Sequence, residues 1–116
     1  MKTAALIIFL MLGLPNLSSA KSQQAPVIVD VRTPDEFADN HLKEAVNIDF
    51  RDQSFETKIK ALNKDQPYIL YCRSGNRSGQ AEKLMKSLGF KSVENLGSLQ
   101  EAAKKLKKDC TVRPGC

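Results

Sequence analysis

Residues 68–80, YILYCRSGNRSGQ, place a cysteine at the point where a run of apolar, β-favouring residues stops. Two arginines, two serines, two glycines and an asparagine follow Cys72 before helical spacing resumes. A loop that leads from a strand into a helix directs unpaired backbone N–H groups and the positive end of the helix dipole toward that cysteine. These groups and the two arginine charges favour thiolate over thiol. The segment therefore predicts an activated cysteine in a cradle for a second anion.

The predicted nucleophile is Cys72, and the residues after it are predicted to bind substrate: Arg73, Ser74, Gly75, Asn76, Arg77 and Ser78. Their backbone N–H groups can form an anion-binding nest, and a guanidinium can pair with the anionic end of a substrate. The sequence does not distinguish which of the two arginines makes that contact. An inert buried thiol is the alternative for Cys72, but such a thiol needs none of the polar, basic and glycine residues that follow it.

Alternating strand and helix patterns surround this loop. Apolar or β-branched runs predict strands at 26–31, 44–49, 68–72 and 91–96. Helical spacing or capping boxes predict four helices, beginning after Thr33, covering 55–62, covering 81–88 and beginning after Ser98. This order predicts an α/β fold, a small doubly wound parallel sheet flanked by helices. Cys72 then ends a central strand, at the sheet edge where ligands bind in such folds.

The ends of the chain predict export and one small domain. Residues 1–20 combine a lysine, a short apolar run and a small-x-small end, which is typical of a signal peptide cleaved after Ala20. The run is too short to span a membrane, and no later segment would anchor the chain. We therefore expect a periplasmic or secreted protein. It would have a disordered segment at 21–25, one domain at 26–109 and a tail at 110–116.

The chain has three cysteines, so one stays unpaired in an oxidising compartment. Cys110 and Cys116 lie in a short tail with a Pro-Gly turn that can fold back and join them, which leaves Cys72 free. Pairing of Cys72 with either tail cysteine is the alternative, since geometry decides whether a bridge can close. That pairing would make the protein redox-gated.

Three stretches resemble the rhodanese domains, which are sulfurtransferases. CRSGNRS resembles their active-site loop, VIVDVRTPDEFADNHLKEAVNI their upstream signature, and GFKSVENLGS the strand after the active-site helix. The likeness runs from residue 26 to 106 and is greatest to the small exported single-domain (phage-shock type) rhodaneses of bacteria. It implies a rhodanese-like fold and thiosulfate:cyanide sulfurtransferase activity, with no cofactor.

The sequence departs from the rhodanese pattern in three places. Asn40 replaces a glycine, Lys43 and Glu44 replace Pro-Gly, and Ser98 replaces a second glycine after Gly97. We expect the first two to concern a turn remote from the chemistry. The third lies at the rim of the predicted site.

The resemblance implies a reaction in two covalent steps. Cys72 takes the sulfane sulfur of thiosulfate or a similar donor as a persulfide, and cyanide or a thiol then accepts it. A persulfide carrier or partner-binding module, with a redox protein as a partner, is the alternative. A phosphatase or arsenate reductase is disfavoured, because those loops place arginine one position later than Arg77.

Other notable residues have simpler interpretations. His41 is expected to hydrogen-bond across a turn, and Arg32 to form an internal ion pair with Glu36, near Asp30. One histidine and scattered cysteines offer no metal-ligand spacing. The formal net charge is +5. It is concentrated in the lysines of 104–108, which we interpret as the solvated end of a helix; we expect no binding to nucleic acid.

Overall fold

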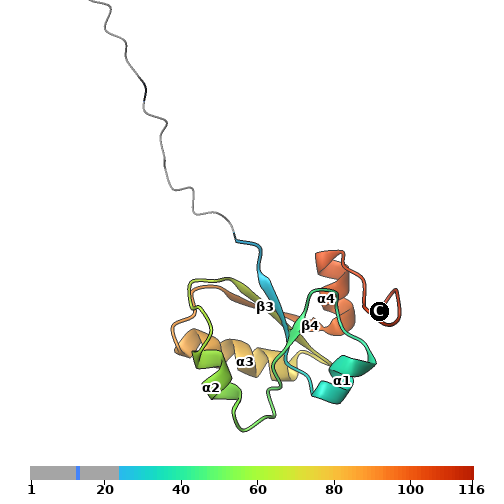
Figure 1. The fold of residues 1–116 in the computed structure, drawn as a ribbon, viewed down its shortest axis with the longest axis horizontal. Coiled ribbons are helices and arrows are strands. Elements are labelled where there is room, and N and C mark those ends of the chain that lie inside the picture. The colour runs from blue at the N-terminus through green and yellow to red at the C-terminus, as the bar shows by residue number, and fades with distance from the viewer. Residues whose placement is uncertain (1–12, 14–23) are drawn as a thin grey trace, which may run out of the picture.

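The computed structural model describes residue 13 and residues 24–116. The predicted signal peptide, residues 1–20, lies outside this part of the chain except for Gly13, and so does most of the predicted segment 21–25. The described chain forms a four-stranded sheet with helices around it (Figure 1). The strands and helices, in chain order, are β1 Val27–Asp30, α1 Pro34–Asp39, β2 Val46–Asn47, α2 Phe55–Lys60, β3 Tyr68–Cys72, α3 Asn76–Ser87, β4 Val93–Ser98 and α4 Leu99–Leu106.

The sheet is parallel and its strands follow the order β2-β1-β3-β4. This confirms the predicted parallel α/β fold and the central position of β3. All five residues of β3 are buried, as expected for a strand that is covered on both faces. β2 has only two residues, shorter than the predicted 44–49, because it pairs only with Val29 and Asp30 at the end of β1. β4 lies two residues later than predicted, since Ser98 still pairs with Cys72.

Local capping signals place the helices. Thr33 caps α1 in a complete capping box with Glu36, and Pro34 takes the first helical position, as predicted. At the start of α4 the Ser98 hydroxyl accepts a hydrogen bond from the Glu101 backbone N–H at 3.1 Å. α2 is shorter than expected and ends at Lys60.

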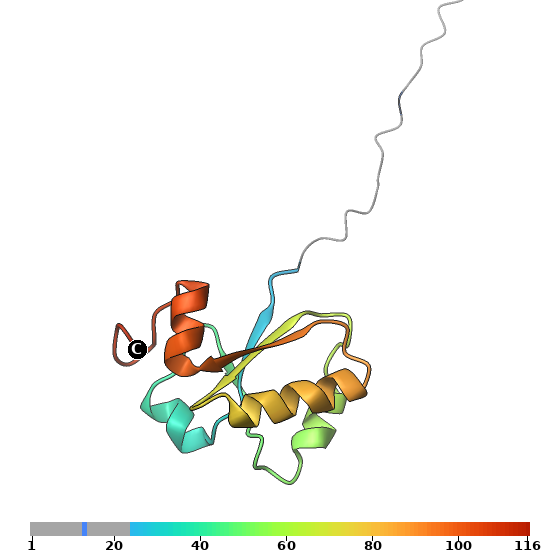
Figure 2. The same cartoon turned by 180° about the vertical axis from the view of Figure 1, so that it is seen from behind.

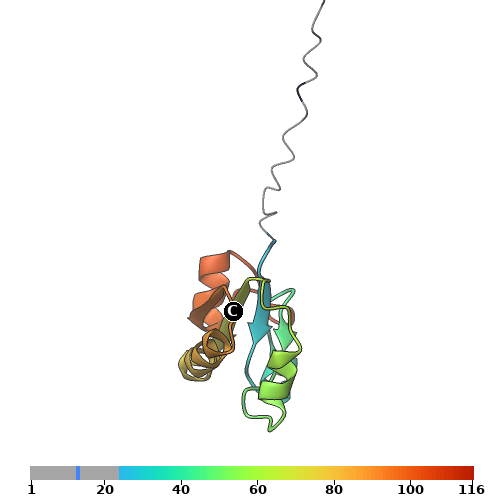
Figure 3. The same cartoon turned by 90° about the vertical axis from the view of Figure 1, so that its left-hand side faces the viewer.

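Two hydrophobic clusters cover the two faces of the sheet. Leu70 and Cys72 of β3 belong to the cluster that includes residues of α2 and α3, such as Ile59 and Met85. Ile69 and Tyr71 belong to the other cluster, with residues of α4. The alternation follows from the two-residue period of a strand. It gives the doubly wound arrangement. Figure 3 views the domain from the end that carries α2.

The carboxyl ends of β1, β3 and β4 meet at one edge of the sheet. α1, α4 and the C-terminus gather at the same end of the domain in both the front and the back views (Figures 1 and 2). The tail pairs with the turn after α1, where Leu42 and Cys110 form an antiparallel bridge. Residues far apart in the sequence are therefore brought next to the Cys72 loop.

Candidate active site

Cys72 is the last residue of β3 and its Sγ lies inside the loop that follows. The sulfur accepts hydrogen bonds from the Gly75 backbone N–H at 2.9 Å and from the Ser78 hydroxyl at 3.2 Å. Cys72 and Ser78 are both fully buried. Gly75 has a φ of 95°, and a Cβ there would lie 3.2 Å from Gly97 Cα. Glycine at this position therefore lets the loop close around the sulfur.

The hydrogen bonds of this loop set the ionisation of Cys72. Burial is the largest single influence and raises the pKa of the thiol, because desolvation disfavours the charged form. The hydroxyl and backbone N–H of Ser78 oppose it, and the backbone N–H groups of Ser74 and Gly75 add to them. These hydrogen bonds together outweigh burial, so the pKa of Cys72 is lowered. The cradle thus favours the thiolate.

Ser78 has one hydroxyl proton and two acceptors within reach. Its Oγ lies 3.2 Å from Cys72 Sγ and 2.7 Å from Asn95 Oδ1. Two further bonds fix the Asn95 amide: Oδ1 accepts from the Gly97 N–H at 2.9 Å, and Nδ2 donates to the Gly75 carbonyl at 3.2 Å. A charged sulfur competes for a proton better than a neutral one. Ionisation of Cys72 therefore turns the hydroxyl from Asn95 toward the sulfur.

The two predicted arginines have different surroundings. Arg77 donates two hydrogen bonds to Glu36, at 2.8 and 3.1 Å, which joins the first turn of α3 to α1. The Arg77 hydrogen bonds are the main reason that the pKa of Glu36 is lowered to about 2. Arg73 is exposed, and its guanidinium has no hydrogen-bond or ion-pair partner among the described residues. Of the two, Arg73 is the one with free donors.

The other two loop side chains point to different roles. The Asn76 side chain accepts a hydrogen bond from Gln80 Nε2 at 2.8 Å on the exposed side of α3. Ser74 contributes to the sulfur through its backbone N–H. Of these two residues, Ser74 thus contacts the sulfur through its backbone, and the Asn76 side chain is directed to Gln80.

The expected ion pair between Arg32 and Glu36 is wrong. Arg32 instead donates to both carboxylate oxygens of Asp30, with Nη2 2.7 Å from Oδ2 and Nε 3.0 Å from Oδ1. The same Nη2 donates to the Asn40 carbonyl at 2.6 Å. Asp30 is completely buried and lies closer in the chain, at the end of β1. Glu36 is left for Arg77.

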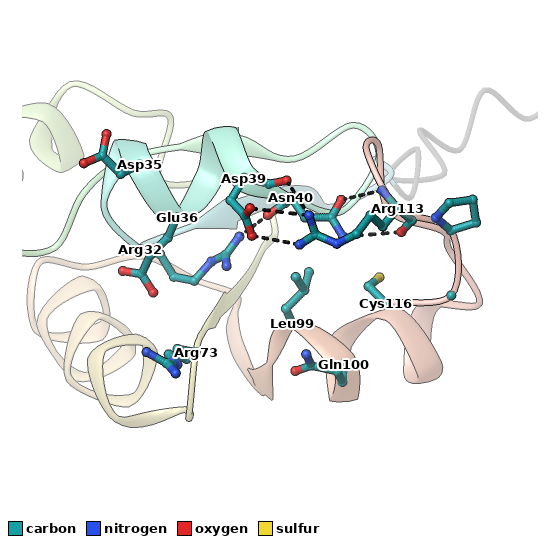
Figure 4. A pocket seen from close by; sticks show the side chains of 12 residues that line it. Arg32, Asp35, Glu36, Asp39, Asn40, Arg73, Leu99, Gln100, Arg113 and Cys116 are labelled. Carbon is teal, nitrogen blue, oxygen red and sulfur yellow. Dashed lines mark hydrogen bonds and ion pairs between the residues drawn. The ribbon is translucent and has the colours of Figure 1, made fainter.

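An open cavity of about 780 Å³ lies beside the loop (Figure 4). Figure 4 shows side chains from α1, from the start of α4 and from the C-terminal tail around it. Its lining comprises Arg32, Asp35, Glu36, Asp39, Asn40, Arg73, Leu99, Gln100, Arg113, Pro114, Gly115 and Cys116. Cys72 is not part of the lining, but the next residue, Arg73, is. The cavity therefore borders the loop that carries Cys72 without being lined by Cys72 itself.

Asn40 belongs to this cavity, which corrects the expectation that its turn is remote from the chemistry. Its side chain is nearly buried, at 4% exposed, and contacts the tail. Glu44, at a position where the family pattern has glycine, has a φ of 70°. The left-handed backbone explains why glycine suits that position.

The cysteines pair within the tail. Cys110 and Cys116 form a disulfide with a Cα–Cα distance of 5.8 Å, and Cys72 is free. Cys72 and Cys110 also belong to different hydrophobic clusters, on opposite faces of the sheet. The structure therefore has the tail bridge and not the alternative bridge to Cys72.

His41 has the structural role that was predicted. Its Nδ1 lies 2.8 Å from the Phe37 carbonyl oxygen, and its ring stacks on the Phe37 ring at 3.5 Å between centroids. It is not among the residues that line the cavity. Across the described chain, no group of three or more His, Cys, Asp or Glu residues is arranged to hold a metal ion.

Sequence reasoning missed three parts of the site: the contact of Glu36 with Arg77, the role of Asn95, and the tail as a cavity wall. Glu36 was expected to pair with Arg32, and in the structure it caps α1 as well as binding Arg77. Asn95 lies in the predicted strand 91–96. A polar amide in such a strand was a signal that its side chain forms specific hydrogen bonds, here with the Cys72 loop. No local pattern linked the tail to the loop.

This fold and this loop define the class of the protein. The rhodanese-like domain family matches residues 14–105, which is most of the chain. The chain therefore belongs to the rhodanese-like domain family.

Particular relatives are thiosulfate sulfurtransferases. The chain is 31% identical over 75 residues to thiosulfate sulfurtransferase PspE of Escherichia coli K12, covering 65% of this chain and 72% of that protein. It is 33% identical over 79 residues to thiosulfate sulfurtransferase GlpE of Pseudomonas syringae, covering 68% and 73%. A solved structure described as rhodanese with anions, from E. coli, superposes with a TM-score of 0.57 at 30% identity, covering 66% of this chain and 91% of that one. These relatives support sulfurtransferase activity.

No helix in the described part of the chain is both long and apolar enough to cross a membrane.

Proposed function

We propose that the protein is a thiosulfate sulfurtransferase that works through a persulfide on Cys72. In the first step the Cys72 thiolate attacks the outer sulfur of thiosulfate. The sulfur–sulfur bond of the donor breaks, its electron pair leaves with sulfite, and a persulfide anion remains on Cys72. Because the attacking group is the thiolate, which the cradle favours by lowering the pKa of Cys72, the step needs no general base.

The second step returns the enzyme to its starting state. A cyanide ion or an acceptor thiolate attacks the outer sulfur of the persulfide. The new bond forms thiocyanate or an acceptor persulfide, and the electron pair of the broken bond returns to Cys72 as thiolate. The charge on sulfur is conserved in both steps, so a fixed cradle of N–H donors can stabilise it throughout.

The observation that carries this proposal is the set of donors around the sulfur. Gly75 N–H and the Ser78 hydroxyl lie within hydrogen-bond distance of Cys72 Sγ, and the pKa of the thiol is lowered despite complete burial of the residue. A structural cysteine requires no such arrangement. The names of the relatives PspE and GlpE support the choice of thiosulfate as donor.

Arg73 is the residue that we propose binds the sulfonate end of the donor. It lines the cavity and has free donors, whereas Arg77 is held by Glu36. The similar E. coli structure is described as rhodanese with anions, which supports an anion site in this fold. Arg77 then has a positioning role: its two hydrogen bonds to the Glu36 carboxylate hold the start of α3 in place.

Two alternatives remain outcomes of the same test. A persulfide carrier that serves one protein partner, such as a redox protein, would form the persulfide but release it slowly to small acceptors. A phosphatase would need arginine where Ser78 stands, and Ser78 instead contacts the sulfur.

We also propose that the protein is exported, because residues 1–20 have a signal-peptide pattern and the Cys110–Cys116 disulfide suits an oxidising compartment.

Intact-protein mass spectrometry before and after thiosulfate tests the proposal. We expect a mass gain of about one sulfur atom on the wild type, reversed by cyanide, and no gain on Cys72→Ala. Thiol labelling beforehand establishes that Cys72 is free in the sample. A wild type with free Cys72 that gains no sulfur would exclude the mechanism.

A further inference from the structure

The cavity beside the Cys72 loop is much larger than the proposed donor needs. Its volume of about 780 Å³ is in the range of roughly 300–1,000 Å³ that encloses ligands of several hundred daltons. Thiosulfate and cyanide are far smaller. We propose that this cavity is the acceptor site, that it takes a carboxylate-bearing thiol of peptide size, and that the disulfide-closed tail, residues 110–116, forms its outer wall. This inference rests on the proposed function.

Asn40 anchors the tail to the domain. Its Oδ1 accepts hydrogen bonds from the Val112 N–H at 3.0 Å and the Arg113 N–H at 3.2 Å, and its Nδ2 donates to the Arg113 carbonyl at 3.3 Å. Its own carbonyl accepts from Arg32. Because Asn40 is nearly buried and its side chain forms hydrogen bonds with three backbone groups of the tail, it fixes the position of that segment.

The disulfide closes the tail into a loop. Cys110 is buried at 2% exposed in the cluster on the α4 face, and Cys116 packs against the same cluster while lining the cavity. Asp109 Oδ1 accepts from the Gly115 N–H at 2.7 Å, next to the bridge. The Thr111 N–H donates to the His41 carbonyl at 2.9 Å. These bonds hold Pro114 and Gly115 against the cavity.

Two arginines offer donors to an anionic ligand at different parts of the cavity. Arg73 comes from the catalytic loop and has no partner within the described chain. Arg113 comes from the tail and is oriented by Asp39, with Nη2 2.8 Å from Oδ2 and Nη1 3.4 Å from Oδ1. Among the described residues its Nε has no hydrogen-bond partner, and it can donate to a carboxylate. Figure 4 shows the two arginines on separate elements around the cavity.

This arrangement suits an acceptor that bears carboxylates at a distance from its thiol. The carboxylates pair with the arginines, while the thiolate attacks the outer sulfur of the Cys72 persulfide. That bond forms as the bond to Cys72 Sγ breaks, and Cys72 recovers its thiolate. The tail then raises the rate of the second step for acceptors that bear carboxylates. The rate of sulfur transfer to cyanide depends little on the tail.

Single-turnover transfer tests this assignment. Wild-type protein loaded with thiosulfate and freed of excess donor is mixed with glutathione, with glutathione diethyl ester or with cyanide. Persulfide loss is followed by quenched intact mass, which also reports whether the Cys110–Cys116 disulfide survives. The variants are Arg113→Ala and Asn40→Gly, and Arg51→Ala is the matched control, an exposed arginine outside the cavity. A Cys110→Ala/Cys116→Ser double variant opens the tail.

We expect glutathione to react about tenfold faster than its ester with the wild type, the effect of about one charge-assisted hydrogen bond. The ratio of glutathione to cyanide rate constants should fall about tenfold in Arg113→Ala, and at least as far in Asn40→Gly and the double variant. It should not change in Arg51→Ala. Equal rates for glutathione and its ester in the wild type, or an Arg113→Ala ratio like that of the control, would overturn the acceptor site. A wild type that never forms the persulfide refutes the proposed function before any acceptor is added.

Discussion

Replacing Ser78 by alanine removes the hydroxyl that donates to the Cys72 sulfur from 3.2 Å. This hydroxyl is the largest of the influences that lower the pKa of Cys72, so the variant should have a higher thiol pKa. Hydrogen bonds to charged groups contribute about 1.5–3 kcal/mol. The lower end applies here, because sulfur is a diffuse acceptor and Asn95 competes for the same proton at 2.7 Å. About 1.5 kcal/mol corresponds to roughly a tenfold smaller thiolate population at a pH below both pKa values.

Alkylation by iodoacetamide as a function of pH measures this effect. We expect the rate for Ser78→Ala to be about tenfold lower than for the wild type at pH values below the midpoints of both profiles, and the midpoint of the Ser78→Ala profile to be moved upward. Ser74→Ala is the matched control, because Ser74 reaches the sulfur through its backbone N–H and should keep the wild-type profile. The Cys110–Cys116 disulfide leaves Cys72 as the free thiol that reacts.

The variant also leaves Asn95 Oδ1 with one donor fewer, so unfolding must be measured in parallel. A folded Ser78→Ala protein with an unchanged or downward-shifted profile would refute the idea that the hydroxyl stabilises the thiolate. A profile that shifts equally in Ser74→Ala would instead assign the effect to general disturbance of the loop.

Two further predictions concern the charged residues around the loop. Glu36→Gln should remove stability that the wild type has above about pH 4.5 and loses as the pH falls toward 2, because Arg77 lowers the pKa of Glu36 to about 2. The expected loss near neutral pH is about 1–3 kcal/mol by urea unfolding, given that the Glu36 side chain is one-quarter exposed; a loss that is the same at pH 3 would contradict it. Arg73→Ala should raise the KM for thiosulfate about tenfold with a smaller change in kcat, and Arg73→Lys should restore part of it, as measured by thiocyanate formation. An unchanged KM would remove Arg73 from the donor site.

Local patterns were sufficient for the parts of this protein that depend on neighbours in the sequence. The strand 68–72 appears with the predicted bounds, since a run of apolar residues followed by a polar loop leaves few alternatives. The Thr33 capping box needs only residues three apart. The cradle around Cys72 likewise lies within six residues, so the nucleophile and the donors of Gly75 and Ser78 could be predicted.

The sequence by itself therefore determined the fold class, the family and the loop that surrounds Cys72, whereas the tertiary structure decided which charged and polar side chains pair with one another. Arg77 lies 41 residues from Glu36 and pairs with it only because α1 and α3 meet at one edge of the sheet. Arg32 has Asp30 before it and Glu36 after it in the sequence, and it pairs with the buried Asp30 at the end of β1. Asn40 meets the tail more than 70 residues later. Such contacts depend on how separate elements pack, and the period of a strand or helix carries no information on that packing.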